Sequence, residues 1–211
     1  MYLQLNRTEI TRKIALYEGS KNGVPYTLSV DKEQNVIHIL SNELELNFSI
    51  EVKDFFGKPE PFENEKRSLS AYYFDSSGNR NNIFYCFKNN KNIFNNITFW
   101  RFFVSENEYE LYEVGRGKQG TYYCVIANNN TKAIIVKKTK VKFSKTGYEL
   151  YCENDFPIEL LIAINLFIDL TKYKTTELYT NQTLHTLQKD LKNKYDSTFI
   201  SKIKNQDGID Y

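Results

Sequence analysis

The chain has 211 residues, which is enough for one large domain or for one domain with an appendage. Its 28 Lys and Arg residues against 26 Asp and Glu give a net charge of +2, and this near-balance excludes a dedicated nucleic-acid binder with a strongly basic domain. An apolar content of 41% with a mean hydropathy of −0.55 indicates a soluble protein with a sizeable core.

Most of the first 154 residues read as short strands rich in Val, Ile, Tyr and Phe, separated by turn residues. The predicted strands are residues 2–5, 26–30, 36–40, 44–52, 69–74, 83–87, 98–104, 108–114, 121–127, 132–138, 141–144 and 148–152. The stretch 8–17 fits either a helix or a strand, and 55–67 is predicted to be a loop. About twelve strands without intervening helices predict an antiparallel sandwich or barrel.

Residues 158–170 interrupt the strand pattern with ten apolar residues in thirteen. Pro157 stands in the first turn of the predicted helix, where its missing N–H costs nothing. Thirteen helical residues span about 20 Å, which is short of the roughly 30 Å of bilayer hydrocarbon. A helix that is apolar nearly all round must be buried. The length and the internal polar residues favour burial inside a surrounding sheet over a membrane anchor.

The composition becomes polar after residue 171. Leu184, Leu187, Leu191 and Tyr195 then recur at helical spacing, and Asp196 is predicted to cap a last short helix with Phe199 and Ile203. Such an apolar stripe is typical of a surface helix that docks on its own domain. The alternative is an arm that binds a protein partner through Leu184, Leu187 and Leu191.

Residues 110–173 resemble the bacterial Tubby C-terminal-like domain, in the superfamily of Tubby, LURP-one and phospholipid scramblases. The resemblance rests on the run YEVGRGKQG at 112–120, the strand KAIIVKK at 132–138, YELY at 148–151 and the apolar helix that follows. It implies a closed antiparallel β-barrel of about twelve strands around a central hydrophobic helix. We therefore expect a mainly β barrel domain at 1–173 with its central helix at 156–172, and a helical C-terminal extension at 174–211. The extension departs from the minimal family pattern.

The clearest charge feature is a run of lysines without an intervening acid, between residues 128 and 147. Lys137, Lys138, Lys140 and Lys142 are predicted to form a charged edge, and Arg116 and Lys118 on the preceding hairpin are predicted to lie nearby. Such a patch attracts anionic lipid headgroups. Tubby relatives bind phosphoinositides through basic side chains, although no ligand residue of theirs aligns with a position here. The alternative is an ordinary solvated strand face.

No local motif predicts catalysis or a cofactor. Gly115, Gly117 and Gly120 match the spacing of a dinucleotide-binding loop, but a strand-like run follows them instead of a helix, which favours a hairpin turn. His38 and His185 have no partner at metal-ligand or triad spacing. Cys86, Cys124 and Cys152 lie in apolar runs and are predicted to be buried, reduced thiols.

The sequence therefore predicts a non-catalytic, cytoplasmic binding module without a metal, a cofactor, a nucleic-acid partner or a transmembrane segment. The initial residues lack a signal-peptide pattern, which supports the cytoplasmic expectation. We expect the module to recognise anionic phospholipid headgroups at the membrane surface. The alternative is a protein-interaction or structural module that uses the C-terminal extension. A third hypothesis, which the sequence favours less, is an enzyme that acts on a small molecule.

Overall fold

The computed structural model describes residues 1–21, 23–33, 36–53, 60–62, 65–88, 97–117, 120–138, 146–172, 191 and 194–208. Its strands are β1 (Tyr2–Ile10), β2 (Ile14–Lys21), β3 (Val24–Glu33), β4 (Val36–Ser41), β5 (Leu46–Val52), β6 (Glu60–Phe62), β7 (Glu65–Phe74), β8 (Arg80–Lys88), β9 (Ile97–Val104), β10 (Asn107–Gly117), β11 (Gly120–Ala127), β12 (Asn130–Lys138) and β13 (Thr146–Cys152). The described helices are α1 (Ile158–Lys172) and α3 (Phe199–Asp207).

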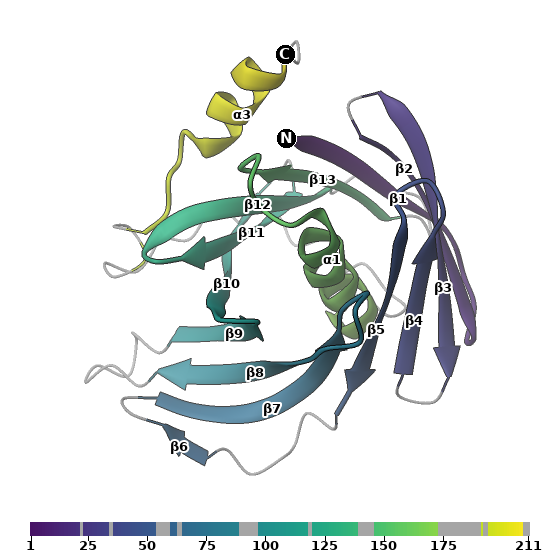
Figure 1. The fold of residues 1–211 in the computed structure, drawn as a ribbon. Helices are drawn as coiled ribbons and strands as arrows, with labels where there is room; N and C mark the ends of the chain where they lie inside the picture. The colour runs from purple at the N-terminus through teal and green to yellow at the C-terminus, as the bar shows by residue number, and fades with distance from the viewer. Residues whose placement is uncertain are drawn as a thin grey trace.

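The strands form one closed antiparallel barrel (Figure 1). Neighbours in the sequence pair with each other, β1 pairs with β13, and β5 pairs with β7 to complete a ring of twelve strands. The closing register runs from Ser49 opposite Phe74 to Val52 opposite Ala71. The short strand β6 lies outside this ring as a hairpin partner of β7. Closure pairs the strand edges that an open sheet would expose.

The strands from β1 to β5 bury alternate residues, as the period of a pleated strand requires. In β4, for example, Ile37 and Ile39 are buried whereas His38 and Leu40 are exposed. The buried set continues around the ring and makes up the inner lining of the barrel. The predicted mainly β barrel is therefore confirmed.

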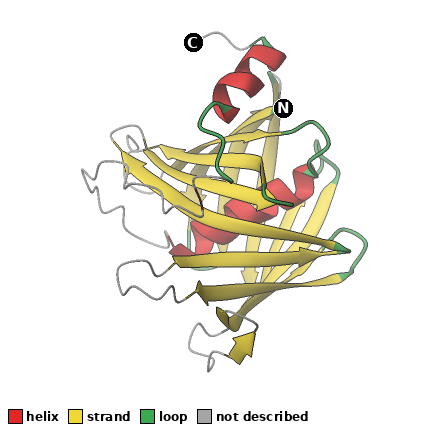
Figure 2. Ribbon diagram, turned by 90° about the vertical axis from the view of Figure 1, so that its left-hand side faces the viewer, coloured by secondary structure: helices red, strands yellow, loops and turns green. Residues whose placement is uncertain are grey.

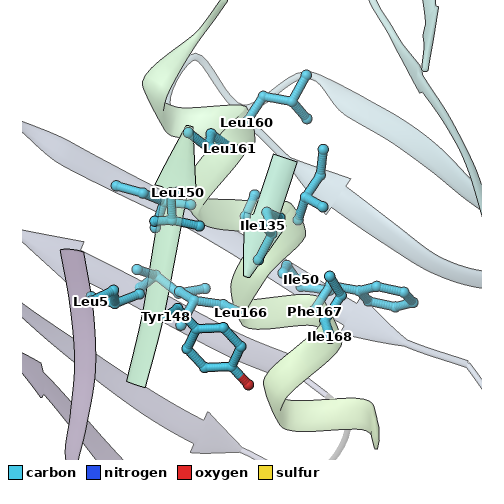
Figure 3. Close-up of a cluster of buried hydrophobic side chains, with 14 of the residues drawn as sticks. Leu5, Ile50, Ile135, Tyr148, Leu150, Leu160, Leu161, Leu166, Phe167 and Ile168 are labelled. Carbon is cyan, nitrogen blue, oxygen red and sulfur yellow. The ribbon is translucent and has the colours of Figure 1, made fainter. Parts of the chain in front are cut away.

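Helix α1 passes through the barrel, as Figures 1 and 2 show from two directions. Every residue from 160 to 170 is buried, so the helix has no solvated face over these three turns. Figure 3 shows Leu161, Leu166 and Phe167 among inward side chains of the surrounding strands, such as Leu150 and Ile50. Phe167 also meets Phe102 edge to face, with 5.7 Å between the ring centroids. The all-round apolarity of the sequence thus predicted the location of the helix correctly.

The amino-terminal turn of α1 is tied to the β7–β8 turn through Glu159. Its carboxylate accepts hydrogen bonds from the Tyr73 hydroxyl, from the Ser76 backbone N–H at 3.0 Å and from the Ser76 hydroxyl at 2.7 Å. Burial, together with the bond to Glu159, raises the pKa of Tyr73, which keeps this hydroxyl protonated as a donor. The contact fixes where the helix enters the barrel.

The outer wall from β8 to β13 carries a second apolar layer, which the C-terminal segment contacts. Leu191 packs with the outward side chains of Phe99, Tyr112 and Ile126. Phe199 and Ile203 of α3 pack on Ile134, Val136 and Tyr151, and Figure 2 shows α3 outside the barrel. The C-terminal helical extension predicted from the sequence is therefore present at α3, and its apolar side faces the chain's own barrel.

Several predicted boundaries differ from the structure. The stretch 55–67 was expected to be a loop, but it contains β6 and the first residues of β7, with Glu60 opposite Arg67. Residues 8–17 belong to β1, β2 and the turn between them. Helix α1 begins at 158 rather than 156, and the N-cap of α3 is Thr198 rather than Asp196. The predicted strand 141–144 lies outside the described residues.

A charge placed on the buried face of α1 should prevent folding. We expect Leu161→Asp to abolish soluble expression, because Leu161 is fully buried and an unpaired carboxylate there costs several kcal/mol. Leu161→Ala should fold with a free energy of unfolding about 2–5 kcal/mol lower, measured in urea. The same changes at Leu40, which is 49% exposed, are the control and should have little effect. Cooperative folding of Leu161→Asp would contradict the buried helix.

Candidate functional site

Three neighbouring hairpins end at the same rim of the barrel. Gly117 of β10 lies opposite Gly120 of β11, and Gly120 lies opposite Lys138 at the end of β12. The next strand, β13, begins at Thr146, opposite Arg7 near the end of β1. The described ends of these hairpins, at residues 10–14, 115–117, 120, 138 and 146, are therefore adjacent, and we call them the basic rim. Residues 118–119 and 139–145 lie outside the described residues.

The predicted basic residues have different places relative to this rim. Lys138 is 43% exposed, and its ammonium lies 2.6 Å from the Glu149 carboxylate. Lys137 is only 7% exposed. It shares a strand face with Ala133 and Ile135, which line the barrel interior, so its side chain does not share the exposed face of Lys138. The structure describes the backbone of Arg116 on β10, whereas Lys118, Lys140 and Lys142 lie outside the described residues.

The β1–β2 turn adds two cations that the sequence analysis did not single out. Arg12 and Lys13 are both exposed, and within the described part of the chain neither forms an ion pair. Ile14, the first residue of β2, is 45% exposed beside them. The exposed acids of this hairpin are Glu9 and Glu18, and the exposed Asp31 of β3 lies opposite Ile14. In the sequence, the signal that could have pointed to these two cations is the dipeptide Arg-Lys between two apolar runs. The position of the β1–β2 turn next to the β12–β13 hairpin depends on the pairing of β1 with β13.

The glycine motif forms a hairpin and not a phosphate-binding loop at a helix. Gly115 and Gly117 lie on β10, Gly120 begins β11, and the register shifts between Glu113 and Gly115 at a bulge. The hairpin expected from the strand-like run after Gly120 is thus confirmed. Its relevance to the basic rim is positional, because the same turn carries Arg116 and Lys118.

A buried polar cluster lies inside the barrel around Asp169, in the last part of α1. Its carboxylate is fully buried and accepts hydrogen bonds from the Arg7 guanidinium at 2.8 Å and from the hydroxyls of Tyr17 and Tyr148, both at 2.7 Å. Arg7 is itself only 4% exposed. Burial and the adjacent carboxylate raise the pKa of Tyr17 well above its usual value, so the hydroxyl remains a donor. The cluster connects α1 to three strands.

Cys86, Cys124 and Cys152 are buried, as the sequence predicted, and no disulfide joins them. Burial raises the pKa of Cys124 and of Cys152 to about 12, which disfavours the thiolate at neutral pH. His38 lies on an exposed strand position, and His185 lies outside the described residues. Within the described ranges, no group of three His, Cys, Asp or Glu side chains could hold a metal ion. No described helix is long and apolar enough to cross a membrane.

The apolar stripe of the C-terminal extension is described at its later positions. Leu191 is 6% exposed and packs on the outer wall of the barrel, where Tyr195 also lies against the same cluster. Leu184 and Leu187 lie outside the described residues. A protein partner that binds through these leucines stays a prediction, and Leu191 is already occupied by a contact within the chain.

Comparison with protein-family models, with curated proteins and with solved structures finds no match to this chain. The closed barrel around α1 is compatible with a Tubby-like fold.

Removing the charge of Asp169 should destabilise the protein strongly. We expect Asp169→Asn to lower the free energy of unfolding by about 3–5 kcal/mol, because it takes the carboxylate away from the buried Arg7. Tyr17→Phe removes only one neutral donor and should cost about 1–2 kcal/mol. Urea unfolding followed by tyrosine fluorescence measures both. If Asp169→Asn lowered the free energy of unfolding no more than Tyr17→Phe does, the charge of the Asp169 carboxylate would not be a main source of stability, which would contradict this prediction.

Proposed function

We propose that this chain is a Tubby-like barrel that acts as a non-catalytic, cytoplasmic binding module and attaches to anionic lipid headgroups through its basic rim. The observation that carries the proposal is the adjacency of three hairpins whose residues include Arg12, Lys13, Arg116 and Lys138. Lys118, Lys140, Lys142 and Lys145 belong to the connections of the same hairpins in the sequence. Arg12, Lys13, Arg116 and Lys138 come from separate sequence segments but belong to one end of the barrel.

Electrostatics would provide most of the attachment. Each Lys or Arg near an anionic membrane surface contributes about 1 kcal/mol, and the attraction fades within a Debye length of roughly 10 Å at moderate salt. The exposed Ile14 next to Arg12 and Lys13 offers an apolar contact to the interfacial region. A module of this kind should bind at low salt and dissociate as the salt concentration rises.

The barrel interior supports a binding role more than an enzymatic one. Large side chains of α1 such as Leu161 and Phe167 fill the space inside the ring. The buried polar groups around Asp169 are engaged with one another through short hydrogen bonds. A ligand therefore has to approach the outer surface or a rim of the barrel.

The rim proposal is tested by reversing the charges of its described turn. Arg12→Glu with Lys13→Glu shifts the net charge by −4 and should weaken binding to phosphatidylserine-containing vesicles at low salt by at least about tenfold. Flotation and a co-sedimentation titration measure this. Lys137 is left intact because its side chain is buried, and changing it would disturb the fold.

The matched control reverses two cations at the other rim, Lys21 at the end of β2 and Arg80 at the start of β8. The pair Lys21→Glu with Arg80→Glu has the same net charge as the test variant and should retain most of the vesicle binding. Equal loss in the two variants would mean that the overall charge and not the basic rim drives the attraction. A lack of wild-type binding to anionic vesicles at low salt would refute the proposal.

A further inference from the structure

A second surface feature lies at the opposite rim, between the barrel and its C-terminal segment. A cavity of about 380 Å³ is bounded by the β11–β12 turn and the start of β12 on one side, and by residues 194–206 on the other. This volume is within the range of small-molecule sites. Its wall residue Lys132 is six residues from Lys138, about 20 Å along β12. The cavity is therefore separate from the basic rim.

The two walls of the cavity are joined by Thr131. Its buried hydroxyl donates a hydrogen bond to the Lys194 carbonyl at 2.9 Å and accepts one from the Asp196 N–H at 3.0 Å. The Lys194 ammonium reaches back to Glu110 on β10, at 2.9 Å. Phe199 of α3 adds an apolar part to the lining and packs on the barrel wall. These contacts hold the C-terminal wall at a defined distance from the barrel.

Each wall carries one ion pair within the cavity lining. On the barrel side, Lys132 lies 2.5 Å from Glu153, and on the C-terminal side Lys202 lies 2.7 Å from Asp196. All four side chains are partly exposed. Hydrogen bonds from Lys202 and Thr198 lower the pKa of Asp196 to about 2, so this acid is ionised at neutral pH. The cavity thus presents both signs of charge on two facing walls.

We propose that this cavity binds a small zwitterion, a molecule such as a free amino acid or dipeptide that carries both an ammonium and a carboxylate. A simple anion that approached Lys132 and Lys202 would have to compete with Glu153 and Asp196 and would leave these carboxylates facing a like charge. A simple cation that approached the two carboxylates would have to compete with the lysines and would leave them facing a like charge. A zwitterion supplies a counter-charge to both members of a pair, which is why both charges of the ligand are needed.

The test uses three related probes, alanyl-alanine, its N-acetyl form and its C-terminal amide, titrated into the full chain by calorimetry. The free dipeptide should bind, and each blocked form should bind at least about tenfold more weakly because it lacks one charge. Backbone NMR shifts in the wild-type protein should locate the dipeptide at residues 129–132 and 194–206. No binding of the dipeptide at millimolar concentration would overturn the proposal, and so would equal affinity for the N-acetyl form.

A variant of the barrel-side pair tests the location, with a matched pair as its control. Lys132→Gln with Glu153→Gln should lose dipeptide binding by about tenfold or more. Lys53→Gln with Glu51→Gln removes a comparable, partly exposed Lys–Glu pair at the end of β5, outside both proposed sites, and it should leave dipeptide binding unchanged. Exposed ion pairs add little to stability, so both variants should fold. Equal effects of the two pairs would contradict the assigned cavity, whatever the outcome of the vesicle experiments.

Discussion

The contact between the Asp169 carboxylate and the Arg7 guanidinium inside the barrel constrains the rest of the structure. Removing two charged groups from water has a free-energy cost of desolvation. A buried pair is stable only where its geometry is favourable and additional hydrogen bonds satisfy the remaining polar atoms. Tyr17 and Tyr148 provide those bonds from β2 and β13. Between Leu160 and Leu170, α1 is apolar except for Asn165 and Asp169. The contacts of Asp169 near its C-terminal end and of Glu159 at its start help to fix the rotation and depth of the helix in the barrel.

Because the side chains of α1 fill the barrel interior, the candidate binding surfaces lie on the outside of the molecule. The antiparallel ring places alternate turns at opposite rims, so that hairpins far apart in the sequence become neighbours. One rim holds the described cations Arg12 and Lys13 of the β1–β2 turn and Lys138 at the end of β12, beside the end of β10 that carries Arg116. At the other rim, the C-terminal segment lies beside the start of β12 and forms a polar cavity with it. The proposed headgroup and zwitterion sites therefore use separate parts of one rigid scaffold.

The sequence predicted the strands and the buried helix because both depend on patterns that are local, whereas the closed ring of about twelve strands was what the family resemblance implied. Strand alternation and the apolar run 158–170 needed no knowledge of distant contacts. The burial of Lys137 could not be predicted from local alternation. Ile134, Ile135 and Val136 are all apolar, because α3 covers Ile134 and Val136 on the outside of the barrel and the interior covers Ile135. The sequence therefore shows no alternation here that would assign Lys137 and Lys138 to opposite faces of the strand. Arg12 and Lys13 were missed because their neighbours are set by the pairing of β1 with β13.

Hydrogen exchange of the α1 amides tests most directly whether the helix and the barrel form one structural unit. Exchange is measured by NMR on the native protein at increasing urea concentration. If the helix and the ring unfold together, the amides of residues 162–170 exchange only by global unfolding, with the same free energy as the central amides of β1 and β13. Exchange of the helix at a markedly lower free energy than these strands would contradict this prediction, because α1 could then leave the barrel while the ring stayed closed.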